Sequence, residues 1–340
     1  MANVTAIVKP TADISKTEYA ISLMFATVCM IITSILSITG TTISIKTFCL
    51  MGLDDGMTFT FFVLSITELA YSVFCLAMSV ASVFHCVELT APKTLFIIDP
   101  FSLLIYFANI CVMVHMSIQV ITTFLAVARC LCVVKPIHFK NAFTKRRCVA
   151  LLIFVWAFSL VSYAPLFASM SIVPQFDPRI NVSRPSLWLS PNRRLVKDII
   201  WTIEDATIPF CTEIIVIVCV IIMADGLRRA AKFRMAASNA SNAPGFNASQ
   251  KVGGKELLII RQVALISAFY ILTNTPKVAS NLYGVVVPQY TLGGQYNNIY
   301  LVVFAFRKLI ETLNCCVSFP VYFQCNPKFR SLTFRWSNKS

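Results

Sequence analysis

Charged residues make up only 13% of this 340-residue sequence, whereas hydrophobic residues make up 57%. A soluble core does not need so large an apolar share, so the composition argues against a soluble protein. Histidine is also scarce, with three residues, and the 13 cysteines show no Cys-x-x-Cys spacing. These shortages argue against a metal site. The sequence has no recognisable nucleophile–base pair either, which argues against an enzyme.

Seven long apolar segments occupy most of the chain. Each has at least the roughly 20 residues with which an α-helix crosses a bilayer. A backbone in hydrocarbon must satisfy its own hydrogen bonds, which favours helices over isolated strands. We therefore expect an all-α membrane protein, a seven-transmembrane helix bundle. The expected helices are residues 19–46, 57–84, 101–132, 148–172, 197–224, 256–285 and 297–324.

The distribution of positive charge predicts the orientation of this bundle. The net charge is +14, and most Lys and Arg residues fall in the first, third and fifth connections and near the C-terminus. By the positive-inside rule that side is cytoplasmic, and its static partners are anionic membrane lipids and not nucleic acid. We expect an extracellular tail over 1–18, a transmembrane domain over 19–324 and a cytoplasmic amphipathic helix and tail over 325–340.

Three features concern the extracellular side. Residues 1–18 have no apolar run, so we expect no cleavable signal peptide, and the first helix would be the membrane signal. Asn3 and Asn181 lie in glycosylation sequons on this side. Cys86 is the one cysteine expected to face the oxidising side, and it has no obvious partner there.

The inner end of the third segment carries a charged motif. The residues FLAVARCLCVVKPIHFK (124–140) place Arg129 next to Cys130, and Pro136-Ile137 follows seven residues after Arg129. An arginine near hydrocarbon is costly, so it suggests a functional role. Glu256 is a second charge on this side, at the start of the sixth segment, and its rival interpretation is a solvated charge at a helix end.

A second motif joins the last apolar segment to the C-terminal residues. Tyr322, Asn326, Phe329 and Arg330 have the spacing Y-x3-N-x2-F-R. Together with the motif around Arg129 and prolines in the fourth to sixth segments, this pattern resembles rhodopsin-like G-protein-coupled receptors over nearly the whole chain. The resemblance implies a receptor of the plasma membrane that binds a ligand among its outer helix halves and activates a heterotrimeric G protein.

A narrower likeness lies in three stretches. FCLMGLDDGMTFTFFVLSITEL (48–69), RCLCVVKPIHFK (129–140) and NTPKV (274–278) are similar to the chemosensory and orphan receptors of molluscs. This likeness implies a chemosensory role.

The resemblance also implies a switch at the inner side. In the family the third-helix arginine pairs with acids at rest and releases them to meet the G protein. Here the preceding acid is replaced by Ala128, and Glu256 at the start of the sixth helix takes the place of the second partner. Arg129, Cys130, Pro136, Ile137, Glu256 and Tyr322 are the expected switch and coupling residues.

A polar cavity in the middle of the bundle is implied as well. Glu68 stands where the family has a sodium-binding aspartate, and Asn314 and Ser318 fall near the same site. A carboxylate there is able to hold Na⁺ or a proton, although the longer side chain changes the sodium geometry. We expect no other cofactor and no metal centre.

Several family positions are altered. Leu104 replaces the third-helix cysteine and the second outer loop (173–196) contains no cysteine, so both ends of the usual disulfide are missing. Asn274 replaces a tryptophan, and Ser318-Phe319 replaces an Asn-Pro pair. These changes leave the expected fold intact but admit constitutive activity or a weakly coupled, partner-dependent receptor.

Polar residues in the outer halves of the helices are the ligand candidates. Inward-facing lysines would attract an anion and the fifth-helix acids would hold an amine, which suggests a small zwitterion or short peptide. An internal salt-bridge network of Lys308 or Arg307 with Glu311 and the fifth-helix acids is an equal alternative. The candidates are Cys111, His115, Gln119, Glu204, Asp205, Lys277, Lys308 and Glu311.

A transporter or channel is the rival class. The odd number of expected segments and the lack of inverted repeats argue against it. The sequence leaves open whether a receptor of this kind works alone or as an oligomer.

Overall fold

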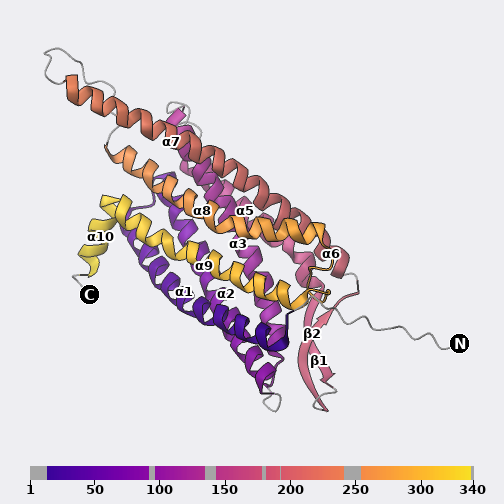
Figure 1. Ribbon diagram of the computed structural model, residues 1–340. Coiled ribbons are helices and arrows are strands. Elements are labelled where there is room, and N and C mark those ends of the chain that lie inside the picture. The colour runs from indigo at the N-terminus through magenta and orange to yellow at the C-terminus, as the bar shows by residue number, and fades with distance from the viewer. Residues whose placement is uncertain are drawn as a thin grey trace.

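The computed structural model describes residues 14–91, 96–134, 143–177, 181–191, 193–240 and 254–337. In this part, long helices run side by side as one bundle (Figure 1). They are α1 (Lys16–Met51), α2 (Gly56–Thr90), α3 (Pro100–Val134), α5 (Lys145–Ala168), α7 (Ile208–Ala240), α8 (Gly254–Val286) and α9 (Asn297–Cys325). Shorter elements are the strands β1 (Met170–Asp177) and β2 (Val182–Leu189), α6 (Arg193–Ile200), the π-helix η1 (Trp201–Thr207) and α10 (Pro327–Ser337).

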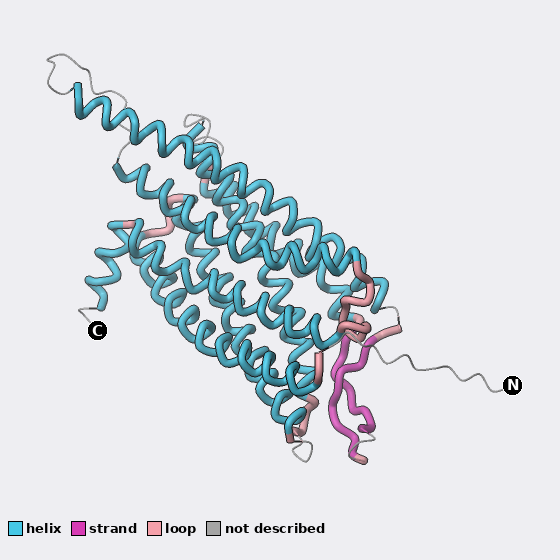
Figure 2. Tube along the Cα trace, viewed as in Figure 1, coloured by secondary structure: helices cyan, strands magenta, loops and turns pink. Residues whose placement is uncertain are grey.

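The two ends of the bundle differ in their short elements. The β1–β2 hairpin and the start of α1 lie at one end, here called the hairpin end, and α10 lies at the other, the α10 end (Figure 1). Figure 2 shows the same division, with strands only at the hairpin end. The expected C-terminal helix within 325–340 is therefore present as α10.

Among the described residues, five helical segments are long and apolar enough to cross a membrane: α1, α2, Pro100–Cys132 of α3, α5 and Trp201–Gly226. Their outward faces are apolar, with Phe25 61% exposed and Val161 73% exposed. Side chains of this kind are unfavourable in water when they cover a whole surface. A helical membrane protein is thus confirmed. Helix α9 is 29 residues long, but Arg307, Lys308 and Glu311 lower its hydropathy.

Local sequence signals explain the first helix boundaries. Ser15 and Glu18 form a capping box, in which the Glu18 N–H donates to Ser15 Oγ and the Ser15 N–H donates to Glu18. Gly52 ends α1 with φ of 86°, a conformation that favours glycine. Asp55 then caps α2. At Gly56 a Cβ would lie 3.2 Å from Cys148 Sγ, so the absent side chain lets α2 pack closely on α5.

The fourth helix is shorter than expected, and a hairpin follows it. The prediction of a helix over 148–172 is wrong at its end, because α5 stops at Ala168 and β1 begins at Met170. The all-α prediction also missed this hairpin, whose antiparallel register pairs Met170 with Leu189 and Pro174 with Pro185. Both strands are edge strands, where prolines are tolerated. The prediction was wrong here because apolar content alone does not distinguish a strand from the end of a helix.

The fifth apolar segment is divided and longer than expected. The predicted helix 197–224 is represented by α6, η1 and α7, and α7 continues to Ala240. In η1 the bonding widens by one residue, as shown by the N–H of Ile208 donating to Ile203 O. Such π-type turns are often found at functional sites.

An aromatic cluster fastens α10 to the bundle. The Tyr322 ring lies 5.2 Å from that of Phe48 and 5.5 Å from that of Phe61. Phe329 of α10 is fully buried and lies 5.1 Å from Phe48. Asn326 accepts the Phe329 N–H at 3.0 Å and thereby caps α10. The Y-x3-N-x2-F-R spacing thus places two aromatic rings and the helix cap at the junction between α9 and α10.

Candidate ligand cavity and polar network

A buried ion pair on α9 lies inside the bundle. Lys308 Nζ is 2.6 Å from Glu311 Oε2, and the Tyr71 hydroxyl of α2 donates to the same oxygen at 2.8 Å. His115 Nδ1 of α3 is 3.8 Å from this oxygen. The lysine and glutamate side chains are 0% and 1% exposed. Charges inside a membrane protein are costly unless paired, so these contacts hold α2, α3 and α9 in one arrangement.

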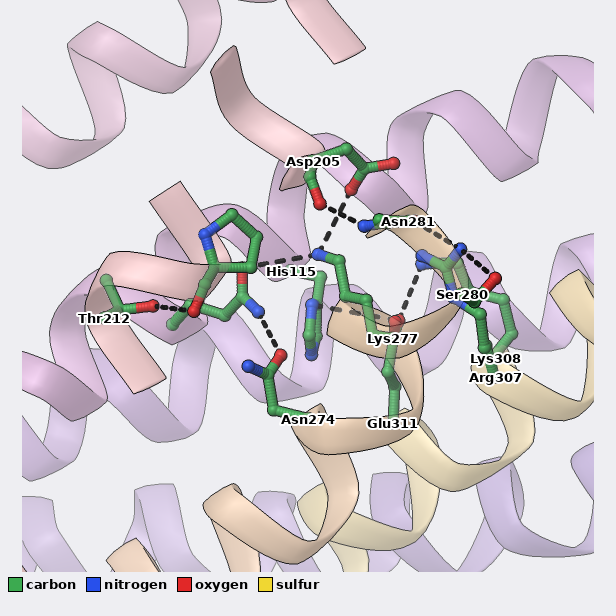
Figure 3. Close-up of polar contacts among 12 residues, drawn as sticks. His115, Asp205, Thr212, Asn274, Lys277, Ser280, Asn281, Arg307, Lys308 and Glu311 are labelled. Atoms are coloured by element: carbon green, nitrogen blue, oxygen red, sulfur yellow. Dashed lines mark hydrogen bonds and ion pairs between the residues drawn. The ribbon is translucent and has the colours of Figure 1, made fainter. Parts of the chain in front are cut away.

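A second ion pair connects α8 with η1. Lys277 Nζ lies 3.2 Å from Asp205 Oδ1 and donates to Gln119 Oε1 at 3.3 Å. Asn281 of α8 donates to the backbone oxygen of Asp205 and accepts from Arg307 Nη1 at 2.7 Å. Figure 3 shows both ion pairs converging between the helices. We call these residues, with those of the first ion pair, the polar network.

The polar network extends toward α7 through amide side chains. Gln119 Nε2 donates to Asn274 Oδ1 at 2.5 Å, and Asn274 Nδ2 donates to Glu213 Oε2 at 3.2 Å. Thr275 donates to the other oxygen of Glu213 at 2.6 Å. Asn274, where the resembled family has a tryptophan, is therefore part of a chain of hydrogen bonds and not an aromatic packing element.

The π-helix explains how two adjacent acids both enter the bundle. Glu204 is 3% and Asp205 4% exposed, and the next residue, Ala206, is also buried. Successive residues of an ordinary α-helix point about 100° apart, so a helix with one lipid-facing side does not usually bury three in a row. The wider turn of η1 presents these residues together. Asp205 has Lys277 beside it, whereas Glu204 Oε2 has no hydrogen-bond partner.

A small cavity of about 80 Å³ lies beside the polar network at the hairpin end. Most of its wall is apolar, from α3, α5, α6 and α9. Trp201 forms part of the wall, and the missing side chain of Gly284 leaves space for its indole ring. The polar and aromatic side chains of the wall are Asn109, Tyr163, Arg193, Trp201, Asp205, Tyr300 and Phe304.

Of the ligand candidates from the sequence, Asp205 alone lines this cavity among the described residues. His115, Gln119, Lys277, Lys308 and Glu311 belong to the polar network and are buried. Cys111 lies beside Cys75, with 3.6 Å between the sulfur atoms. The structure therefore contains the Lys308–Glu311 pair of the internal salt-bridge alternative, but the ion-pair partner of the fifth-helix acid Asp205 is Lys277. Direct ligand contact by these side chains stays a prediction.

Sequence reasoning missed other residues of the site. Arg193 was not among the candidates, because it is one of several charged residues in the loop 173–196. Asn281, Tyr71 and Glu213 belong to no motif. The signal that existed was the adjacent pair of acids in an apolar segment, which pointed to Asp205.

The expected polar cavity near Glu68 is formed in part. Ser318 donates to Glu68 Oε1 at 2.7 Å, while Glu68 Oε2 is buried without a hydrogen-bond partner. Asn314 is buried on the same helix as Ser318, but within the described part of the chain it makes no hydrogen bond to either residue. Binding of Na⁺ or a proton at Glu68 stays a prediction.

The expected switch residues are only partly described. Arg129 is 9% exposed near the α10 end of α3, and its Nε has no hydrogen-bond partner among the described residues. Cys130 is buried next to it. Glu256 falls in the first turn of α8, but its side chain lies outside the described residues, as do Pro136 and Ile137. An Arg129–Glu256 pair therefore stays a prediction.

Of the two sequons on the expected outer side, Asn181 is exposed at the turn between β1 and β2, with φ of 55°. Asparagine tolerates this left-handed conformation better than most residues. Asn3 lies outside the described residues.

The hairpin is attached to the bundle by charged and backbone contacts. Arg184 Nη1 lies 2.7 Å from Glu88 Oε1, and Arg184 Nη2 lies 3.4 Å from Asp99 Oδ1. The Leu187 N–H donates to Ser102 Oγ at 2.7 Å. All 13 cysteines are free, and Cys86 is buried. The link between hairpin and third helix, covalent in the resembled family, is non-covalent here.

No family model matches the chain, and a search of the curated proteins finds no similar sequence. The class that the structure itself defines is a helical membrane protein with a buried ionic network next to a small cavity. Any more specific assignment depends on the motifs and on the placement of the network.

Proposed function

We propose that this chain is a rhodopsin-like G-protein-coupled receptor with a chemosensory role. In this proposal α8 and α9 cross the membrane with the five apolar segments, and the hairpin end faces the outside of the cell. The observation that carries the proposal is the polar network, which joins α2, α3, η1, α8 and α9 in one half of the bundle. Arg129 lies toward the opposite end, where α10 is packed.

A ligand at the hairpin end would act through the Lys277–Asp205 pair. This pair is one of the contacts between α8 and the fifth-helix segment. A ligand that binds better to an arrangement with this contact altered shifts the population toward that arrangement. Movement of helix ends at the α10 side would then expose the surface around Arg129 to a heterotrimeric G protein.

The first prediction concerns basal signalling. Glu256→Ala is expected to raise basal G-protein activation about fivefold, because loss of a contact worth about 1 kcal/mol shifts a two-state equilibrium by that factor. Arg129→Ala is expected to change the signal as well, since its guanidinium would meet the G protein. The measurement is dissociation of G-protein sensors in cells, at matched surface levels of each variant.

The matched control is Arg228→Ala, which removes an exposed positive charge from the same end of the bundle. If the wild type and both test variants give the signal of untransfected cells despite surface expression, the proposal that an Arg129–Glu256 contact holds the receptor inactive fails. Substrate-dependent uptake into vesicles without any G protein would then favour the transporter class, for which buried ionic networks are also typical.

A second prediction tests the orientation. Asn181→Gln is expected to remove one N-linked glycan, because the exposed hairpin turn would face the lumen during synthesis. The measurement is gel mobility before and after glycosidase treatment. Asn239→Gln, in a sequon on the expected cytoplasmic side, is the control and should leave mobility unchanged. A shift caused by the Asn239 change, and none by the Asn181 change, would reverse the proposed topology.

A further inference from the structure

The cavity wall contains a buried cation that has no acidic partner among the described residues. Arg193, the first residue of α6, is 8% exposed. Its Nη2 donates to the sulfur of Met170 at 3.3 Å, and its Nε has no hydrogen-bond partner. Asn109 Nδ2 points to the same sulfur at 3.8 Å. A thioether is a weak acceptor, so the guanidinium is poorly compensated.

The electrostatic balance of the wall is correspondingly positive. Burial lowers the pKa of the Arg193 guanidinium, because its charge has lost water. Asp205 also lines the cavity, but its carboxylate lies 3.2 Å from Lys277 and is neutralised there. One positive charge therefore remains on the wall without a counter-charge. A guanidinium offers paired N–H donors in a plane that matches a carboxylate.

We propose that this cavity binds a small monocarboxylate with an apolar body, whose carboxylate pairs with Arg193. The apolar walls, including Trp201, Phe304 and Leu301, suit a short branched hydrocarbon. A volume of about 80 Å³ admits only a compact molecule. A zwitterion fits less well, because its amine would have to displace Lys277 from Asp205. A phosphate would bring a second negative charge that the wall does not balance.

This proposal gives the ligand class for the receptor proposed above, and only its signalling consequence depends on that function. The test uses the purified full-length protein in lipid nanodiscs and measures its thermal unfolding temperature. The ligands are propionate, butyrate and isobutyrate, each compared with its uncharged amide, and isobutylamine represents amines. At least one of these acids is small enough for the cavity. Compounds that bind the folded state raise its unfolding temperature.

At least one acid is expected to raise the unfolding temperature by a few degrees, while its amide and isobutylamine do not. Arg193→Gln should weaken the apparent affinity for that acid at least about tenfold, the effect of losing roughly 1.4 kcal/mol. Arg228→Gln removes an equal charge from an exposed position on α7 that does not line the cavity, and it should change nothing. Ala108→Leu, which fills the cavity and keeps Arg193, should abolish the response and serves if Arg193→Gln does not fold.

Three results would overturn the proposal: no shift with any acid, equal shifts with acid and amide, or an acid response that survives both Arg193→Gln and Ala108→Leu. Because the readout contains no G protein, a shift without any cellular signal would contradict the receptor function and leave the binding site standing. Signalling in response to amines alone would contradict the proposed binding site and leave the receptor function standing.

Discussion

Replacing Lys308 with methionine is expected to leave little folded protein. The Glu311 side chain is 1% exposed and would lose a partner at 2.6 Å. Removal of one member of a buried ion pair costs about 3–5 kcal/mol, because the other charge stays buried without compensation. That loss is a large part of the roughly 5–15 kcal/mol by which proteins are stable. The measurement is the monodisperse fraction after detergent extraction and heating.

The double variant Lys308→Met/Glu311→Gln separates charge from packing. It removes both charges and keeps a polar group that is able to accept from Tyr71, so it should recover most of the stability lost in the single variant. Lys16→Met, at an exposed lysine in the first turn of α1, is the control and should behave like the wild type. A single variant as stable as the wild type, or a double variant no better than the single one, would show that the pair does not stabilise the bundle.

Replacing Arg184 with methionine is expected to release the hairpin from the bundle while the helices stay folded. Arg184 is 12% exposed and contacts Glu88 and Asp99 on two separate segments. Hydrogen bonds to charged groups contribute about 1.5–3 kcal/mol, so the open population should rise about 10- to 100-fold. The measurement is the rate of chymotrypsin cleavage at the hairpin, which follows the open population when opening and closing are fast.

Charge exchange supplies the check on this prediction. Arg184→Glu alone should be cleaved at least as fast as Arg184→Met, because it places like charges together. Adding Glu88→Arg restores an opposite pair, and cleavage should slow again. If the exchange variant stays as sensitive as Arg184→Glu, the tether depends on something other than the charge of Arg184.

The long helices could be predicted because apolar length and backbone hydrogen bonding leave few alternatives in hydrocarbon. The end of α5 could not, because the apolar residues of Met170–Asp177 continue those of the helix, and only their pairing with the next strand, Val182–Leu189, defines them as a strand. The Lys308–Glu311 ion pair could be predicted as an alternative to ligand contact, because residues about one helical turn apart lie on the same face of a helix. The proposed carboxylate contact of Arg193 could not be predicted either, because Arg193, Met170 and Asn109 are brought together only in the folded chain.

The non-covalent attachment of the hairpin has a practical consequence for handling the molecule. Because all 13 cysteines are free, the chain needs no oxidation step to reach this arrangement. Thiol reductants should therefore leave the hairpin attached to the bundle, and synthesis in a reducing compartment should give the same fold. High salt, which screens ionic contacts near the surface, is the condition under which the hairpin is expected to loosen.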